Sequence, residues 1–439
     1  MKISELTAAD PLNGSELFVI VQNGNSRKCS VSEILSSAPD SHGLYPDVPL
    51  NRVTIKRYAS QTSTTMTVCD NVGLIDKIKA TAYPVLLDRN SRIAAYLNGN
   101  NMQKTVDGLT AVLDDWTLQS MVRMGGIWYK YYYVAATNEK VFHFSPYKVR
   151  GYKYIRRRFL NCFGGVVETH DNKSMLLSIA DRFTTQSVSL ANFHTYAKNL
   201  GTSYREIATQ DREVYRFYFW LMEQTFNSQS ILRGICDVGS SWWAAYSRTA
   251  DGGQSTYGQF HKTGETLSIT GHKGEKTLTV NNGSSDATVK PNKWLWRENM
   301  LAGPYWIWET GYCKKNGKWY RALDINTVTG FDPTDTTKWE ELCDSCNTDG
   351  YILEDFQDTL IPSAVGGSDT TGMADYNYQA QTENTVYIPA GVGYAFTGST
   401  CGVSVLSSDS GASGAHAGCG GALASDDPTD VIADGTVAA

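Results

Sequence analysis

The segment 201–230 carries the most regular helical pattern in the chain, and it constrains the fold more than any other stretch. Its apolar residues recur at steps of three, four and seven, which places them on one face of a helix: Ile207, Val214, Phe217, Tyr218, Leu221 and Met222. Thr202 and Ser203 stand where an N-cap is expected, and Glu206 follows Ser203 at the capping-box spacing. We predict a helix that ends near Phe226 and serves as a buried scaffold for surrounding β structure.

Charged residues of this segment fall mostly off the apolar stripe, as expected for a helix with one polar face: Arg205, Asp211, Arg212 and Glu213.

Composition favours a β-rich, loop-rich protein with large aromatic surfaces. The 439 residues include 25 Tyr, 11 Trp and 39 Gly, and the 41% hydrophobic content suffices for at least two cores. A net charge of -6 gives no electrostatic reason to bind nucleic acid. Because no apolar run approaches the roughly 20 residues that span a bilayer, and the N-terminus lacks an apolar signal, we expect no membrane insertion or signal-directed export.

Nine scattered cysteines do not form a disulfide pattern. Cys343 and Cys346 are the only close pair, and a zinc site would need two further ligands at matching spacing. The chain also lacks the nucleophile-elbow, zincin and phosphate-loop motifs. We therefore expect buried free thiols, no metal, no cofactor and no enzymatic activity.

Residues 1–36 are predicted to form a small separate module. Residues 17–21 have the pattern of a strand, 23–25 that of a tight turn and 27–31 that of the returning strand, followed by a short helix at 33–35. Such a module is too small for a stable core of its own, so we expect it to depend on a partner.

The sequence of this module is similar to one common at the N-terminus of bacteriophage tail-fibre proteins. The shared blocks are I-S-E-L, L-x-G-S-E-L, V-x-Q-N-G and a closing S-V-S-E-I. The resemblance implies a virion protein, made in the host cytoplasm, that docks onto other phage tail proteins through residues 1–36. It also implies a homo-oligomer, which we expect to be a trimer.

Beyond a polar linker at 37–44, the chain alternates short strand-like runs with turns. Residues 121–160 are aromatic and strand-like, and 234–292 resemble a long excursion with short hairpins. Four tryptophans crowd the stretch that follows: Trp294, Trp296, Trp306 and Trp308. Because Trp is rarely fully buried, some of these should lie at the edge of a core or a cleft.

From about residue 94 onward, successive blocks resemble one family. They are AAYLNGNNMQKTVDG, GGIWYKYYY, SVSLANFHTYAKNLGTSYREI, FWLMEQTFNSQSIL, WRENMLAGPYWIWETG, GYILEDFQDTLIPSAVGG and the Gly/Ser/Ala-rich stretch 385–424. The family comprises phage and prophage proteins with a C-type-lectin-like, formylglycine-generating-enzyme-like domain, including receptor-binding proteins diversified by retroelements.

The resemblance implies an α+β fold, with a small β-rich attachment module followed by a large lectin-like mixed α/β domain with long loops. We expect an attachment module and linker at 1–40, a β-rich connecting region at 41–120, the lectin-like receptor-binding domain at 121–425 and a tail at 426–439.

By the same resemblance, the ligand-binding surface lies within residues 390–423, where fixed glycines alternate with variable runs. The expected ligand-binding residues are Tyr394, Phe396, Thr397, Ser399, Thr400, Ser407, Ser408, Asp409, Ser413 and His416. The chain departs from the family pattern at Ala422, where Arg is usual, and at Ser404, where an aromatic residue is common. Small Gly, Ser and Ala side chains bury little apolar area, so a scaffold beneath must hold this segment.

Three functions fit these observations. The first is a non-catalytic tail-fibre or tail-tip adhesin that binds a bacterial surface receptor, either glycan or protein. The second is a structural virion protein in which the Gly/Ser/Ala stretch is a low-complexity tail or a subunit interface. The third is an enzyme of the formylglycine-generating type, for which Cys401 and Cys419 lie in the right region but without a cationic neighbour in sequence.

Overall fold

Strands dominate the structure, a computed structural model. It describes residues 17–22, 25–30, 38–40, 43–58, 63–235, 237–238, 247–249, 255–257, 260–281, 285–326, 331–395, 397–411 and 413–430. Strands account for 42% and helices for 13%, and the described residues contain three α-helices. The expected α+β class is therefore wrong, and the fold is β-rich. The reason is that the Tyr-, Val- and Trp-rich runs pair into large sheets, whereas the helical pattern is confined to a few short segments.

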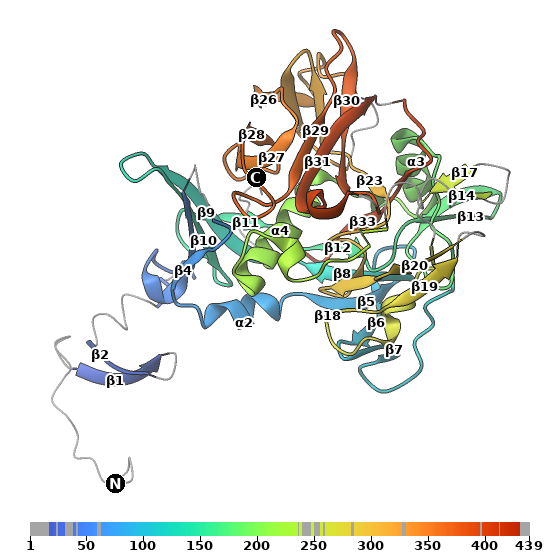
Figure 1. Cartoon of the computed structure of the whole chain (residues 1–439). Coiled ribbons are helices and arrows are strands. Elements are labelled where there is room, and N and C mark those ends of the chain that lie inside the picture. The colour runs from blue at the N-terminus through green and yellow to red at the C-terminus, as the bar shows by residue number, and fades with distance from the viewer. Residues whose placement is uncertain are drawn as a thin grey trace.

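Two sheets form the part of the body that comes first in the chain (Figure 1). The five-stranded sheet has the order β11 (Lys153–Ile155), β9 (Ile127–Val134), β10 (Glu139–Ser145), β3 (Val53–Tyr58) and β4 (Thr67–Asp70). The seven-stranded sheet has the order β15 (Tyr204–Glu206), β33 (Leu423–Asp426), β12 (Arg158–Asn161), β8 (Gln119–Met124), β5 (Tyr83–Leu87), β6 (Ile93–Asn98) and β7 (Asn101–Thr105).

These pairings cross the expected domain boundary at residue 120. Strands from residues 53–105 pair directly with strands from residues 119–161 in both sheets. The C-terminal β33 also joins the seven-stranded sheet, and Asp427 beyond it forms an ion pair with Arg123 at 2.7 Å. Sheets are thus shared by three expected segments: the connecting region at 41–120, the start of the lectin-like domain at 121–425 and the start of the tail at 426–439.

A ten-stranded sheet rises over the body and carries the C-terminal segment (Figure 1). Its main path is β26 (Trp339–Asp344), β25 (Lys318–Ala322), β24 (Tyr312–Lys315), β30 (Val386–Val392), β31 (Gly402–Gly411), β29 (Tyr376–Gln379), β27 (Gly350–Asp355) and β28 (Pro362–Val365). Off this path, β23 (Trp306–Trp308) pairs with β30 and, in parallel, with β32 (Cys419–Gly420).

Short hairpins and small sheets complete the described structure. They are β1 (Leu17–Gln22) with β2 (Asn25–Ser30), β13 (Val166–His170) with β14 (Lys173–Leu177), β16 (Ser247–Thr249) with β17 (Ser255–Tyr257), β19 (Leu278–Asn281) with β20 (Asp286–Val289), and β18 (Lys273–Glu275) with β21 (Asn292–Trp294) and β22 (Arg297–Glu298). The N-terminal hairpin and the short hairpins expected within 234–292 are confirmed where the structure describes them. The expected turn at 23–25 and helix at 33–35 fall wholly or partly outside the described residues.

Helix α4 (Thr209–Glu223) is the buried scaffold that the apolar stripe predicts; the other helices are α2 (Leu74–Lys79) and α3 (Leu190–Leu200). In Figure 1, α4 lies near the centre of the body, below the ten-stranded sheet. Phe217 packs on Phe142 and Phe144 of the five-stranded sheet, with ring centroids 6.1 and 5.2 Å away. The scaffold prediction is confirmed.

The predicted start of this helix is wrong. Residues Tyr204–Glu206 pair with β33 as a strand, so the helix begins only at Thr209. The Asp211 carboxylate accepts a hydrogen bond from the Ala208 backbone N–H at 2.8 Å, which gives the first turn its cap. The helix ends at Glu223 because Gln224 adopts a left-handed conformation.

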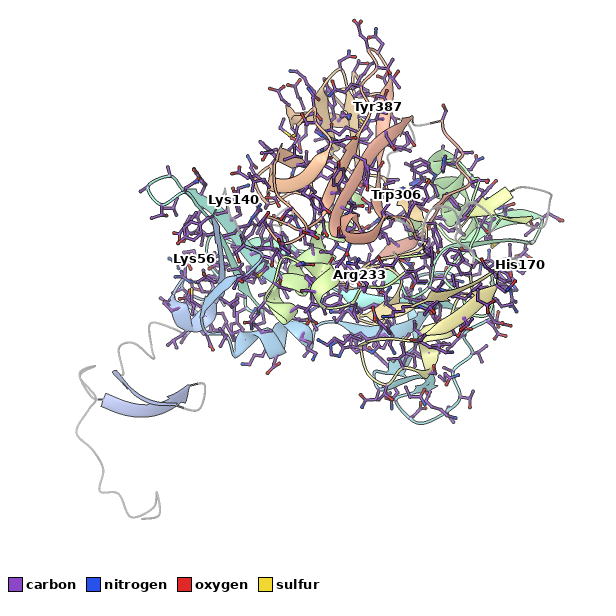
Figure 2. All side chains as sticks on the ribbon, in the orientation of Figure 1. Lys56, Lys140, His170, Arg233, Trp306 and Tyr387 are labelled. Atoms are coloured by element: carbon purple, nitrogen blue, oxygen red, sulfur yellow. The ribbon has the colours of Figure 1, made fainter. Side chains whose placement is uncertain are left out.

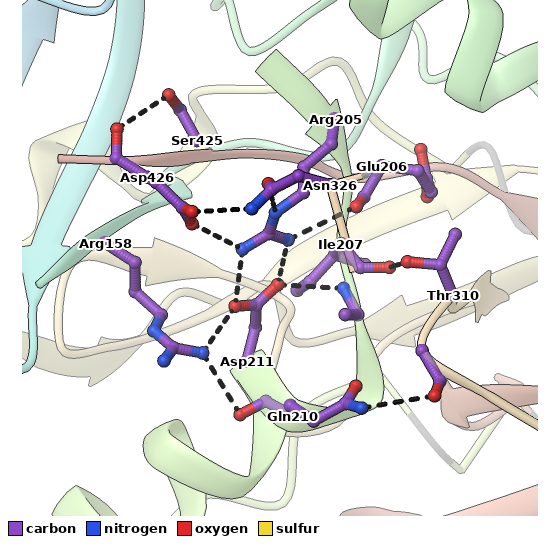
Figure 3. Close-up of polar contacts among 12 residues, drawn as sticks. Arg158, Arg205, Glu206, Ile207, Gln210, Asp211, Thr310, Asn326, Ser425 and Asp426 are labelled. Carbon is purple, nitrogen blue, oxygen red and sulfur yellow. Dashed lines mark hydrogen bonds and ion pairs between the residues drawn. The ribbon is translucent and has the colours of Figure 1, made fainter. Parts of the chain in front are cut away.

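Three of the charged residues expected on a polar face, Arg205, Asp211 and Arg212, are buried instead, and Glu213 is half-buried. Figure 3 shows the polar contacts around Arg205 and Asp211. Arg205 forms an ion pair with Asp211, and Arg158 reaches the same carboxylate at 2.8 Å. Arg205 comes from β15, just before the helix, whereas Arg158 comes from β12 and precedes Asp211 by 53 residues. A charged side chain on a helix that has no solvent-exposed face needs a partner of opposite charge. The ion pairs therefore take the place of water around these side chains.

Glu213 of α4 leads to a pH prediction. Its Oε1 accepts hydrogen bonds from the Tyr312 hydroxyl and the Leu360 backbone N–H, both at 3.0 Å, and burial raises the pKa of this carboxyl to about 7. The folded pKa of Glu213 lies above the ordinary 4.5, so the folded protein favours the protonated carboxyl. The contribution of this protonated carboxyl to the free energy of unfolding is complete below pH 4.5 and is lost as pH rises through 7.

We therefore expect Glu213→Gln, which cannot ionise, to gain stability relative to the natural protein by about 3 kcal/mol between pH 4 and pH 8. Urea unfolding of both proteins across this pH range measures the difference. A difference that stays constant with pH would show that Glu213 does not titrate in this way.

Candidate functional site

Four tyrosines and one tryptophan form a continuous row of rings on the ten-stranded sheet. Adjacent ring centroids lie 5.2 Å apart from Tyr351 to Tyr376, 4.6 Å from Tyr376 to Tyr378, 5.5 Å from Tyr378 to Trp306, and 5.5 Å from Trp306 to Tyr394. We call these five residues the tyrosine row. The four tyrosines are half-buried and Trp306 is nearly buried, so the row combines a fixed base with accessible rings.

Strand pairing explains how the row forms. Tyr351 on β27 lies opposite Tyr376 on β29, and Tyr378 occupies the same face of β29 because side chains alternate along a strand. Trp306 comes from β23, whose partner β30 ends just before Tyr394. Figure 2 labels Trp306 near the base of the ten-stranded sheet. Segments far apart in sequence therefore meet at one surface.

Hydrogen bonds from the C-terminal segment fix the tyrosine hydroxyls. The Tyr351 hydroxyl lies 2.7 Å from Ser399 Oγ, and the Tyr378 hydroxyl lies 2.6 Å from Thr400 Oγ1. Burial raises the pKa of Tyr378 to about 12, so this hydroxyl stays protonated at neutral pH. Rings held in this way lose little conformational freedom when they bind a ligand.

His416 anchors the end of the row. Its Nδ1 accepts a hydrogen bond from the Gly418 backbone N–H at 3.0 Å and lies 3.1 Å from the Tyr394 hydroxyl. A Cβ built on Gly418 would lie 2.3 Å from the Tyr394 ring, so only glycine leaves room for that ring. The imidazole itself is exposed beside the row.

Four of the expected site residues thus come together at the tyrosine row: Tyr394, Ser399, Thr400 and His416. Thr397 is half-buried, and its hydroxyl donates to the Tyr394 carbonyl at 2.7 Å, so it shapes the turn that carries them. Phe396 lies outside the described residues.

The second group of expected residues divides between core and surface. Ser407 and Ser408 are buried in β31, with 3% and 0% exposure, and therefore do not belong to the candidate site. The error follows from the sheet: β31 is an interior strand between β30 and β29, and both serines are buried there. Asp409 is exposed near the end of the strand, and Ser413 is exposed in the turn that follows.

Sequence reasoning missed Tyr351, Tyr376 and Tyr378, which lie outside the expected segment. The available signal was the spacing of Tyr376 and Tyr378, since two aromatic residues at period two lie on one face of a strand. Trp306 was singled out as part of a tryptophan cluster with members at the edge of a core, and its place under the row confirms that expectation.

A buried ion pair supports the C-terminal segment from below. Arg212 of α4 donates to Glu309 through two nitrogens, at 2.5 and 3.0 Å, and also to the backbone carbonyls of Val403 and Val405 in β31. The segment then re-enters the core through β32 and β33. The alternative of a low-complexity tail is therefore wrong, and the expected scaffold is α4 together with β23.

The two cysteines considered for enzymatic chemistry are both buried, with 0% exposure for Cys401 and 3% for Cys419. Burial raises the pKa of the Cys419 thiol, which opposes formation of the reactive thiolate. Among the described residues, no group of three or more His, Cys, Asp or Glu side chains is arranged to hold a metal ion. No helix in the described part of the chain is long and apolar enough to cross a bilayer.

Comparison with models of known protein families finds no match to this chain, and comparison with curated proteins finds none either.

Proposed function

We propose that this protein is a non-catalytic phage tail-fibre or tail-tip adhesin that binds a bacterial surface receptor through the tyrosine row. The virion context is supported by the resemblance of residues 1–36 to tail-fibre attachment modules. The binding role is supported by the row itself, with half-buried tyrosines whose hydroxyls are held by Ser399, Thr400 and His416.

The tyrosine row is the observation that carries this proposal. Tyrosine and tryptophan are enriched at recognition surfaces because they offer large contact area and a polar group at low conformational cost. Here Ser399 and Thr400 hold the rings while leaving them partly accessible.

An enzyme of the formylglycine-generating type finds less support. Its chemistry requires a reactive, accessible thiolate, and Cys401 and Cys419 are both enclosed. The two sulfur atoms instead belong to the packing beneath the surface: Cys401 Sγ lies 2.6 Å from the Thr397 hydroxyl, and Cys419 is part of the same apolar cluster as Trp306.

The proposal is tested by binding of the fluorescently labelled full chain to a panel of bacterial cells. On cells that bind the natural protein, we expect Tyr376→Ala and Tyr394→Ala each to weaken binding about tenfold or more. The reason is that central aromatic residues are typical hot spots. Tyr133→Ala is the matched control, because that side chain is 50% exposed on β9, outside the row. Melting curves would verify that all variants fold.

Unchanged binding by both row variants would place the receptor site elsewhere. Equal loss with Tyr133→Ala would point to a nonspecific effect of removing tyrosine and would also contradict the proposal.

A further inference from the structure

A polar groove of about 410 Å³ opens at the tip of the ten-stranded sheet. It is lined by residues of β24 and the turn after it, by Tyr387 of β30, and by the 380–383 turn that precedes β30. Figure 2 labels Tyr387 near this tip and Trp306 near the base of the sheet. The groove includes no residue of the tyrosine row, and its volume lies within the range of roughly 300–1,000 Å³ typical of small-molecule sites.

Lys314 forms the floor of the groove and is 1% exposed. Its ammonium donates to Gln379 Oε1 at 3.1 Å and to the Ala380 carbonyl at 2.9 Å, both uncharged acceptors. No carboxylate of the described residues lies within ion-pair distance of it. An ammonium carries three N–H donors, so one remains for a further acceptor.

Lys293 and Arg297 are also buried without a carboxylate partner among the described residues, since they donate to the Ile269 carbonyl and to Asn161. Lys314 differs in lining the groove, where it lies over the rings of Trp319 and Tyr387, with Nζ 5.9 and 5.3 Å from their centroids. Burial lowers the pKa of Lys314 to about 8, and the ammonium form still prevails at neutral pH. A buried donor beside an open groove is a typical element of a ligand site.

The rim of the groove supplies the complementary groups. Gln381, Thr382 and Glu383 are exposed there and offer an amide, a hydroxyl and a carboxylate, and Asn316 adds a second amide from the opposite turn. Donors and acceptors are therefore mixed around one small space. A sugar hydroxyl both donates and accepts, so a polyhydroxylated ligand can satisfy Lys314 and Glu383 at the same time.

We propose that this groove is a second ligand site, which binds a neutral saccharide unit with its hydroxyls between Lys314 and Glu383. An acidic sugar fits less well, because its carboxylate would meet Glu383, and Asp349 and Asp409 already act on the Lys314 ammonium electrostatically. The inference depends on the groove alone and holds whether or not the tyrosine row binds a receptor. A single shallow sugar site is weak, and repetition in an oligomer would strengthen it through avidity.

The test is retention of the full chain on a microarray of neutral and acidic bacterial polysaccharides. We expect the natural protein to bind neutral polysaccharides, and Glu383→Gln and Lys314→Met to reduce that binding about tenfold or more, as expected for loss of a charge-assisted hydrogen bond. Glu383 is exposed, so its substitution leaves folding intact even if Lys314→Met does not. Lys153→Met is the control, since Lys153 is exposed on β11.

Two results would overturn the inference. One is that no polysaccharide on the array retains the natural protein, or that the Glu383→Gln variant binds neutral polysaccharides as well as the natural protein does. The other is retention by acidic polysaccharides alone that grows stronger with Glu383→Gln, which would identify an anion site. Tyr376→Ala should bind the array like the natural protein, and this separates failure of the groove from failure of the tyrosine row.

Discussion

Replacing Asp355 with Asn is expected to leave the chain without a stable fold at room temperature. Asp355 lies at the end of β27 with 1% exposure, and three cations surround its carboxylate. Arg57 reaches Oδ1 at 2.8 Å, Arg216 reaches Oδ2 at 2.9 Å, and Lys140 lies 3.2 Å from Oδ1. All three are buried as well.

The position of this cluster explains the size of the expected effect. Arg57 and Lys140 come from β3 and β10 of the five-stranded sheet, Arg216 comes from α4, and Asp355 comes from the ten-stranded sheet. The carboxylate therefore joins the two sheets and the central helix. The neighbouring cations hold the pKa of Asp355 far below its usual range despite burial, so it is ionised at every pH at which the protein would be studied.

An amide at this position would leave three buried positive charges without a counter-charge. Breaking a single buried ion pair costs about 3–5 kcal/mol, and the whole stability of a domain is about 5–15 kcal/mol. We expect Asp355→Asn to accumulate as insoluble protein or to melt far below the natural chain, as measured by soluble yield and thermal unfolding. Asp171→Asn is the control, because that carboxylate pairs with Arg89 at the surface and has 64% exposure.

A melting temperature close to that of the natural protein would contradict this prediction. It would mean that the three cations are neutralised or hydrated in another way, and that the cluster does not hold the sheets together. The control should not change the melting temperature, since Asn tolerates the left-handed backbone at this position, where φ is 53°.

The sequence predicts local features of this fold that depend on short-range chemistry. The β1–β2 hairpin follows from two neighbouring strand-forming runs, and the β24–β25 hairpin follows from the Asn316-Gly317 turn, where both residues have positive φ. The buried face of α4 follows from its apolar period. Each of these depends only on neighbours within a few residues.

Features that depend on distant partners were not predictable from sequence. Tyr204–Glu206 has a capping-box pattern, yet its pairing with β33, more than two hundred residues later, makes it a strand. Arg212 and Arg216 appear solvent-exposed on a helical wheel because a wheel cannot show the Glu309 and Asp355 carboxylates that receive them. Ion pairs between remote segments therefore explain why the charged residues of α4 are buried, whereas the β-rich class follows from pairing of strands that lie far apart in the chain.

The candidate site shows the same division. The resemblance located Tyr394, Ser399, Thr400 and His416 in one segment, and the structure places them together. The tyrosines that complete the row come from β27 and β29, and a single segment cannot reveal which distant strands lie beside it.

Gly402→Ala tests whether the C-terminal segment is seated on the core in the way described. Gly402 begins β31 with a φ of 148°, and a Cβ built there would lie 1.8 Å from Asp375 Oδ1. Asp375 cannot move aside easily, since it is fully buried and its Oδ2 accepts a hydrogen bond from the Ser404 backbone N–H at 2.7 Å. A methyl group at this position must therefore displace the start of β31.

We expect this substitution to cost about 3 kcal/mol or more, through overpacking and backbone strain together. It should also abolish binding to bacterial cells, because the displaced strand directly follows Ser399 and Thr400, which hold the tyrosine hydroxyls. Gly411→Ala is the matched control at the other end of β31, where the nearest atom to a built Cβ is 3.8 Å away. If both variants melt and bind alike, β31 does not rest on Asp375, and the small residues of this segment do not position the tyrosine row.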